Sequence, residues 1–223
     1  MSAIVITGAG SGLGRALALQ YSKDYNEIIL IGRNHERLQQ TKDILQQTRE
    51  LEVSTYTVNI QNQNEVESLC TSLFTKHDAA ALINNAGVGH FGPVTSLSAD
   101  EISEMLDTNV KGTILLSQAF IKEFQKKGKG KILNIISTAG LRGKVNESVY
   151  VASKFAVRGF TESLAKELGG TAITIAGAYM GGMDTPFWDN NDHIKDKSRL
   201  KSPEVIAEKI YRLDDGRAEI IVE

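Results

Sequence analysis

Short runs of β-branched and aliphatic residues recur along the chain, and the segments between them carry apolar residues at helical spacing. The apolar runs alternate little with polar residues, as expected for strands that are buried on both faces of a parallel sheet. We therefore predict strands at residues 3–7, 27–31, 53–59, 80–84, 131–137, 172–178 and 219–222.

Helices are predicted between these strands, and two of them begin at recognisable caps. Asn62 with Glu65, and Ser98 with Glu101, have the spacing of capping boxes. The other predicted helices cover residues 13–25, 34–49, 149–168 and 203–213. Because strands and helices alternate along the chain, we expect an α/β fold: a Rossmann-type, doubly wound sheet of about seven mostly parallel strands with helices on both faces.

The composition fits a single domain that spans residues 1–223. No repeat or linker-like segment divides the chain, and 41% of its residues are hydrophobic. A formal net charge of −2 provides no general attraction to nucleic acid. The single cysteine, Cys70, suits a reducing compartment, and we find no signal peptide or membrane-spanning run. We expect a cytoplasmic protein without a nucleic-acid or membrane partner.

A glycine-rich turn, Thr7-Gly8-Ala9-Gly10-Ser11-Gly12-Leu13-Gly14, follows the first predicted strand and opens a helix. Glycines let a backbone approach a diphosphate closely, and a helix N-terminus presents free N–H groups to it. A phosphate-binding P-loop is excluded because no Gly-Lys-Ser/Thr follows. A connection without a ligand is the alternative, but the position after strand one favours a dinucleotide. We expect contacts to it from Gly8, Ser11, Gly12, Leu13 and Gly14.

The end of the second predicted strand indicates which dinucleotide binds. A cofactor with a free ribose 2′-hydroxyl calls for Asp or Glu there, whereas this chain has Gly32-Arg33-Asn34. The planar guanidinium of Arg33 suits a phosphate, so we predict NADP(H) in preference to NAD(H), bound by Arg33 and Asn34. The alternative is an arginine on the surface of the following helix.

Tyr150 and Lys154 stand four residues apart in a predicted helix and so share one of its faces. A lysine ammonium beside a phenol favours the phenolate, so we expect a lowered pKa for Tyr150 and a role in proton transfer. Ser137, at the end of the preceding strand, is placed to hold the same substrate oxygen. An ordinary amphipathic helix with an exposed lysine is the alternative.

Together these features resemble the classical short-chain dehydrogenase/reductase (SDR) family over residues 4–185. The resemblance rests on five features in order: the glycine turn, the run Asn84-Asn85-Ala86-Gly87, Asn109, Ser137, and Tyr150-Val151-Ala152-Ser153-Lys154. It implies a catalytic set of Asn109, Ser137, Tyr150 and Lys154. Tyr150 would give a proton to a carbonyl oxygen that Ser137 holds, Lys154 would hold the nicotinamide ribose, and Asn109 would anchor a water of the proton relay.

The resemblance also implies further cofactor contacts. They are expected from Asn59, Ile60, Asn85, Ala86, Gly87, Gly182, Met183 and Thr185. Three departures stand out: Asn59 where the family usually has Asp, Met180 where it has Pro, and a chain that stops at Glu223 without the family's tetramer-forming tail. Without that tail, the assembly that the resemblance still implies is a homodimer through the helices that carry Asn109 and Tyr150.

The segment from about 183 to 202 is expected to form a lid over the substrate. Its aromatic residues Phe187 and Trp188 are predicted to line an apolar pocket with Leu141, Val145 and Met183, or else to pack only on the body of the protein. The acidic residues Asp189, Asp192 and Asp196 with His193 lack the spacing of a calcium loop, so we expect a solvated segment and no metal.

These inferences predict an NADP(H)-dependent oxidoreductase that transfers a hydride between the nicotinamide and a small carbonyl or alcohol substrate, working as a reductase. The alternative from another class is a non-catalytic NADP(H)-binding sensor or scaffold with the same fold, against which the retained Ser137, Tyr150 and Lys154 argue. A nucleoside-sugar epimerase is disfavoured because the chain has no separate substrate domain.

Overall fold

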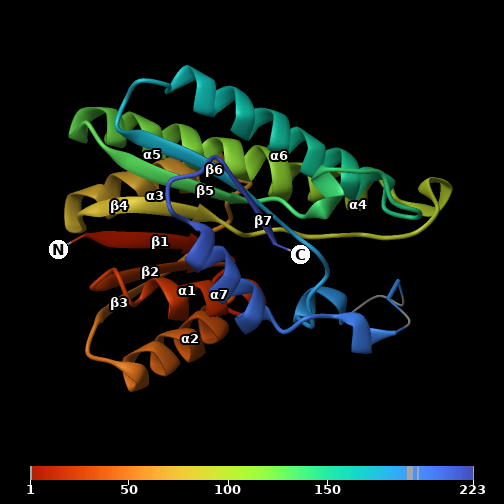
Figure 1. The fold of residues 1–223 in the computed structure, drawn as a ribbon, viewed down its shortest axis with the longest axis horizontal. Coiled ribbons are helices and arrows are strands. Elements are labelled where there is room, and N and C mark those ends of the chain that lie inside the picture. Colours follow the sequence, from red (N-terminus) through yellow and green to blue (C-terminus); the bar gives the residue numbers. More distant parts are fainter. Residues whose placement is uncertain (1, 190–192, 195, 223) are drawn as a thin grey trace.

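The computed structural model describes residues 2–189, 193–194 and 196–222. Its centre is a seven-stranded sheet in which every neighbouring pair is parallel, with the order β3-β2-β1-β4-β5-β6-β7 (Figure 1). The strands are β1 Ala3–Thr7, β2 Glu27–Gly32, β3 Glu52–Thr57, β4 Ala79–Asn84, β5 Gly130–Ile135, β6 Ile173–Met180 and β7 Glu219–Val222. The predicted doubly wound sheet is confirmed.

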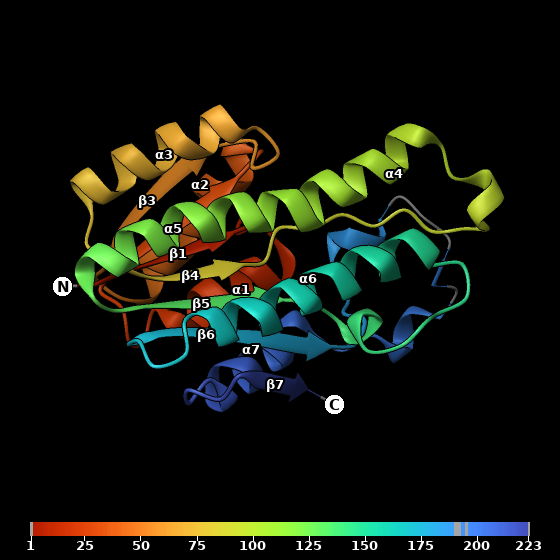
Figure 2. The same ribbon diagram turned by 90° about the horizontal axis from the view of Figure 1, so that it is seen from above.

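Helices cover both faces of the sheet, as Figures 1 and 2 show. On one face lie α1 Gly12–Tyr21, α2 His35–Thr48 and α7 Pro203–Leu213; on the other lie α3 Gln63–Lys76, α5 Thr113–Lys127 and α6 Ser148–Glu167. Side chains of β1 alternate between the two resulting cores, with Ile4 and Ile6 on the first face and Ala3 and Val5 on the second. Burial on both faces explains the uninterrupted apolar runs in the sequence.

Helix α4, Ala99–Leu106, runs into α5 through a π-helical segment, Asp107–Gly112. Its backbone hydrogen bonds span five residues instead of the four of an α-helix, so the segment changes the direction in which the following side chains point. Asn109 lies in this segment, where the sequence predicted only an ordinary helix. Short 3₁₀ turns complete the described structure at Val94–Ser96, Thr138–Gly140, Pro186–Trp188 and Lys197–Arg199.

Several predicted boundaries were wrong by two residues or more. Strand β3 ends at Thr57 and β5 at Ile135, while β6 continues to Met180, which pairs with Val222 of β7. The Ser98–Glu101 capping box is complete, but at the other predicted box only Asn62 caps the helix. The carboxylate of Glu65 instead accepts a hydrogen bond from the backbone N–H of Asn59, at 2.8 Å.

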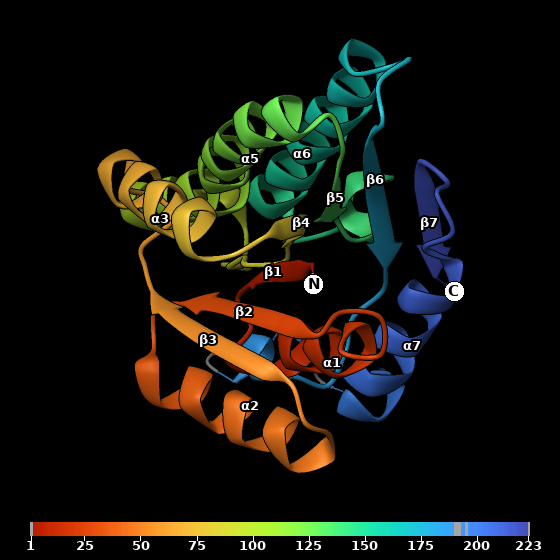
Figure 3. The same cartoon turned by 90° about the vertical axis from the view of Figure 1, so that its left-hand side faces the viewer.

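The sheet has its topological switch point between β1 and β4, because the chain proceeds outward from β1 to β2 and β3 and then returns to β4 on the other side. Figure 3 shows β2 and β3 on one side of β1 and the strands from β4 to β7 on the other. In such sheets ligands bind beyond the carboxyl ends of the strands at the switch point. The glycine turn after β1 and the loop after β4 therefore face one another across the expected site.

Candidate active site

The glycine turn after β1 is built so that only glycine fits at its key positions. Gly8 and Gly12 have φ angles of 64° and 50°, in the left-handed region that favours glycine. A Cβ at Gly14 would overlap the carbonyl oxygen of Gly8. The turn can therefore bring its backbone close to a ligand, as predicted for a diphosphate.

The first turn of α1 has no side-chain cap in the described structure. Among the described residues, Ser11 at the N-cap of α1 makes no side-chain cap hydrogen bond, whereas Asn34, Asn62, Ser98 and Ser202 cap α2, α3, α4 and α7. The first N–H groups of α1 thus remain available to a negatively charged group at the mouth of the glycine turn.

Thr7 joins the glycine turn to the loop after β4. Its hydroxyl accepts hydrogen bonds from the backbone N–H groups of Asn85 and Ala86, both at 3.0 Å. The side chain of Asn85 in turn donates to the carbonyl oxygens of Thr7, at 2.9 Å, and Gly8, at 3.3 Å. These contacts fix the two sides of the switch point relative to one another.

A cleft with a volume of about 740 Å³ opens above the carboxyl ends of the strands. It brings together most of the predicted site residues: Gly8, Ser11, Gly12, Leu13, Gly14, Arg33, Asn85, Ala86, Gly87, Ser137, Tyr150, Lys154, Gly182, Met183, Thr185, Phe187 and Trp188. A smaller pocket of about 130 Å³ shares Arg33 with this cleft and contains Asn59 and Ile60. Gln61 and Thr108, which the sequence did not single out, also line the smaller pocket and are joined by a 2.6 Å hydrogen bond.

Asn34 caps α2 with its side chain, and its contact with the cofactor stays a prediction. Its side chain accepts a hydrogen bond from the backbone N–H of Arg37, at 2.9 Å, and so caps α2. In the described structure Asn34 lines neither the cleft nor the smaller pocket, while Arg37 lines the cleft. The capping preference of Asn before a helix was the signal that could have assigned its role.

Ser137 follows β5 in a strained backbone conformation. Its φ of 110° lies in the region that favours glycine, although the residue carries a side chain. The Ser137 hydroxyl oxygen accepts a hydrogen bond from the backbone N–H of Ala139, at 3.2 Å, which starts the 3₁₀ turn. This conformation ends the strand two residues before the predicted boundary and presents Ser137 to the cleft.

Tyr150 and Lys154 lie on one face of α6, as predicted, but their electrostatics differ from the expectation. Tyr150 is only 8% exposed, and burial raises the pKa of its phenol; a hydrogen bond with Ser137 acts in the opposite direction. Burial also lowers the pKa of Lys154 to about 8. The Lys154 ammonium donates to the carbonyl oxygen of Ile135, at 3.1 Å, and lies 5.7 Å from the Tyr150 ring centroid. The predicted lowering of the Tyr150 pKa was therefore wrong, because desolvation by burial outweighs the hydrogen bond with Ser137.

Asn109 is buried, and its side-chain amide holds the loop after β4. Its Oδ1 accepts from the backbone N–H of Val88, and its Nδ2 donates to the carbonyl oxygen of Val88, both at 2.9 Å. Nδ2 also donates to the hydroxyl of Ser153, at 3.0 Å, which itself donates to the carbonyl of Tyr150. Asn109 thus connects the loop after β4 to the helix that carries Tyr150 and Lys154.

An aromatic cluster borders Tyr150. The ring centroid of Phe91 lies 5.4 Å from that of Tyr150, 5.0 Å from Trp188 and 4.8 Å from His193. Phe187 also contacts Tyr150, at 5.9 Å. The prediction that Phe187 and Trp188 border the cleft agrees with this arrangement, but Phe91 was missed because nothing in its local sequence marks a contact with residues about 100 positions away.

Leu141 and Val145 do not join this aromatic cluster. Leu141 packs instead against the buried group formed by Ile136, Val157 and Tyr179, and Val145 is 83% exposed. Neither lines the cleft in the described structure. Both residues belong to the polar loop that leads away from Ser137, so proximity in sequence to Ser137 was a misleading signal.

Charged residues complete the rim near α6. The carboxylate of Glu147, at the N-cap of α6, lies 3.1 Å from Nε2 of His193 and 3.9 Å from Nζ of Lys144. These contacts tie the lid segment to the start of the helix that carries Tyr150. Glu147 also raises the pKa of Tyr150 through its negative charge, after the larger effect of burial.

The described residues hold neither a metal-binding cluster nor a membrane-spanning helix. Across the described residues, no group of three or more His, Cys, Asp or Glu side chains is placed to hold a metal ion, and Asp192 of the predicted acidic segment lies outside those residues. None of the helices formed by residues 2–189, 193–194 and 196–222 combines the length and hydropathy that a membrane crossing requires.

Comparison with known proteins identifies the family of this chain. The family model for short chain dehydrogenases matches residues 2–196. The chain belongs to the short-chain dehydrogenase/reductase family. A protein described as an uncharacterized oxidoreductase from Staphylococcus aureus (strain USA300) is 30% identical over 209 residues, which cover 94% of this chain and 89% of the relative.

Solved structures of SDR proteins have the same fold. A variant of actinorhodin polyketide ketoreductase with NADPH is 27% identical, with a TM-score of 0.88 and coverage of 99% of this chain and 95% of that one. An alcohol dehydrogenase from the archaeon Thermococcus sibiricus, complexed with 5-hydroxy-NADP, is 26% identical, with a TM-score of 0.90 and coverage of 100% and 96%. This chain is thus an SDR oxidoreductase by family.

Proposed function

We propose that this SDR protein is an NADP(H)-dependent reductase that converts a small carbonyl compound to an alcohol. The observation that carries the proposal is the convergence of Ser137, Tyr150 and Lys154 in one cleft with the glycine turn. The cofactor, when bound, supplies the hydride that the carbonyl carbon receives. The chain's own residues bind the dinucleotide, hold the substrate oxygen and provide the proton.

The residues present fit a dinucleotide with a 2′-phosphate. The glycine turn and the uncapped first turn of α1 suit the diphosphate. Arg33 stands at the end of β2 where a carboxylate would otherwise select a free 2′-hydroxyl, and its side chain borders both the cleft and the smaller pocket. The solved structures with NADPH and 5-hydroxy-NADP support the same preference.

Tyr150 provides the proton in the proposed reduction. Because burial raises its pKa, the phenol carries its proton at neutral pH and can donate it to the carbonyl oxygen as the hydride arrives. Ser137 would hold that oxygen, and Lys154 would bind the nicotinamide ribose and stabilise the phenolate that remains. The contacts of Asn109 with Val88 and Ser153 support a positioning role, and the relay water stays a prediction.

Substitution of Tyr150 by Phe tests this proposal directly. The hydroxyl is lost while the ring contacts with Phe91 and Phe187 are retained, so NADPH should bind with an affinity within about twofold of wild type. Turnover should fall by at least 100-fold, in line with the usual contribution of a positioned acid. We would measure NADPH oxidation across ketones, aldehydes, quinones, ketoacyl thioesters and sugars, and cofactor binding by fluorescence titration.

A non-catalytic NADP(H)-binding sensor predicts a different outcome. In that case wild-type protein would bind NADPH but oxidise it with none of these carbonyl compounds, and Tyr150→Phe would change nothing. The cofactor preference has its own test, since Arg33→Ala should weaken NADPH binding selectively. Equal losses for NADPH and NADH would contradict the role of Arg33.

A further inference from the structure

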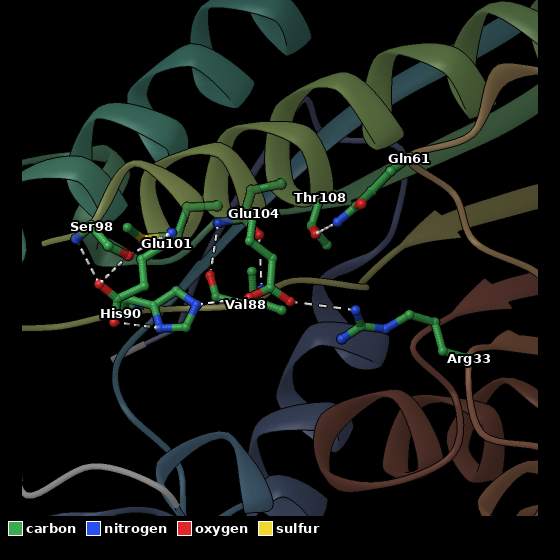
Figure 4. Close-up of polar contacts among 10 residues, drawn as sticks. Arg33, Gln61, Val88, His90, Ser98, Glu101, Glu104 and Thr108 are labelled. Carbon is green, nitrogen blue, oxygen red and sulfur yellow. Dashed lines mark hydrogen bonds and ion pairs between the residues drawn. The ribbon is translucent and has the colours of Figure 1, made fainter.

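Arg33 is engaged by a carboxylate from the opposite side of the cleft. Its Nη1 lies 3.4 Å from Oε1 of Glu104 on α4, and the side chains are 60% and 36% exposed (Figure 4). Arg33 comes from the end of β2 and Glu104 from the other wall, and both line the cleft. The guanidinium that would recognise a 2′-phosphate is therefore paired with a carboxylate in the free protein.

Glu104 is held in place by neighbours on its own side of the cleft. Its Oε2 lies 2.9 Å from Nε2 of His90, and Nδ1 of His90 lies 3.6 Å from the carboxylate of Glu101. Glu101 in turn accepts hydrogen bonds from the backbone N–H and the hydroxyl of Ser98 in the capping box, at 2.8 and 2.9 Å. Figure 4 shows this series of contacts, which fixes the Glu104 carboxylate at the mouth of the cleft.

The charge on Glu104 persists under the conditions in which the protein would bind a cofactor. The hydrogen bond with His90, followed by the hydrogen bond and charge of Arg33, keeps the pKa of Glu104 below its ordinary value. A phosphate that approaches the Arg33 guanidinium consequently meets the negatively charged Glu104 carboxylate, which is already bound there. A free 2′-hydroxyl carries no charge and leaves the Arg33–Glu104 pair undisturbed.

We propose that Glu104 is a specificity-determining residue for the cofactor, which competes with the 2′-phosphate for Arg33 and so limits the preference for NADP(H) over NAD(H). The inference rests on the proposed function, because it assumes that Arg33 receives the phosphate. An exposed pair of this kind is weak, so its removal should change affinity by severalfold rather than by orders of magnitude.

The test compares Glu104→Gln with two reference variants. Glu101→Gln is the matched control, because it removes one carboxylate from the same helix and the same cleft, and glutamine can still complete the capping box. In the described structure Glu101 contacts Ser98 and His90 and forms no hydrogen bond or ion pair with Arg33. Arg33→Ala removes the proposed phosphate ligand. Binding of NADPH, NADH, 2′,5′-ADP and 5′-AMP would be titrated by calorimetry at low and high salt, after urea unfolding has verified that each variant is folded.

We expect Glu104→Gln to tighten NADPH and 2′,5′-ADP by about three- to fivefold at low salt, and to leave NADH and 5′-AMP within about twofold. Glu101→Gln should change the NADPH to NADH ratio less, and in the Arg33→Ala background the gain from Glu104→Gln should shrink. An unchanged ratio in Glu104→Gln, or a selective loss of NADPH, would overturn the competition while the proposed function stands. If Arg33→Ala weakens both dinucleotides equally, the proposed cofactor preference fails, and this inference fails with it.

Discussion

Asn109 and Val88 are joined by a closed pair of hydrogen bonds, in which the side-chain amide of one residue takes both backbone groups of the other, each at 2.9 Å. The second N–H of the same amide reaches Ser153 on α6. A single buried side chain thereby positions the loop after β4 against the helix that carries Tyr150 and Lys154.

Substitution Asn109→Asp should be strongly destabilising, because a carboxylate oxygen would face two acceptors in place of the amide N–H groups. We expect a loss of about 2–4 kcal/mol in the free energy of unfolding, measured by urea denaturation. Asn64→Asp is the control: Asn64 is exposed in the first turn of α3, and the same chemical change there should cost less than about 0.5 kcal/mol. Similar losses at both positions would refute the role of the amide.

Two substitutions of Ser137 distinguish the role of its hydroxyl from the strain in its backbone. Ser137→Gly and Ser137→Ala both remove the hydroxyl, so both should lower turnover, but only glycine relieves the strain at φ 110°. Ser137→Gly should therefore be more stable than Ser137→Ala by about 1 kcal/mol in thermal or urea unfolding. If the alanine variant proved equally stable, the conformation would carry no strain.

Phe91 is expected to restrict the size of the substrate. Phe91→Ala would remove a ring that contacts Tyr150, Trp188 and His193, and so enlarge the space beside the phenol. The ratio of kcat/KM for an aryl ketone to that for a small aliphatic ketone should rise by about tenfold. Phe155→Ala serves as the control, since Phe155 is 41% exposed on α6 and does not line the cleft in the described structure. A ratio that responds equally to both changes would exclude Phe91 from the substrate pocket.

Burial of Lys154 predicts a pH dependence of stability. Its pKa falls from 10.5 to about 8 in the folded protein, so between these values the unfolded chain binds more protons and stability rises with pH. Well below pH 8 the full cost of the buried charge is present, on the order of 3 kcal/mol. Lys154→Met removes this contribution. The unfolding free energy of wild type relative to Lys154→Met should increase from pH 7.5 to pH 10 in urea titrations, and a constant difference would contradict the assignment.

Much of this architecture was predictable because it depends on local pattern. The seven strands, the glycine turn and the Tyr150–Lys154 face follow from residue type and spacing alone. The direction of the Tyr150 pKa shift could not be predicted in this way. Spacing shows that Lys154 is near, but it does not show the burial that has the largest effect on this pKa. Phe91 and Glu104 were missed for another reason: each acts through residues distant in sequence, Trp188 for the first and Arg33 for the second.

The π-helical segment Asp107–Gly112 sets the rotational phase between α4 and α5. One extra residue in a helix rotates the side chains before it by about 100° about the helix axis, relative to the side chains after it. Deleting that residue would leave a continuous helix whose second half still packs on the sheet, while Asn109 would turn away from Val88. The loss of a single codon could thus disable the site and spare the fold, so the length of this segment is as much a part of the active site as any side chain within it.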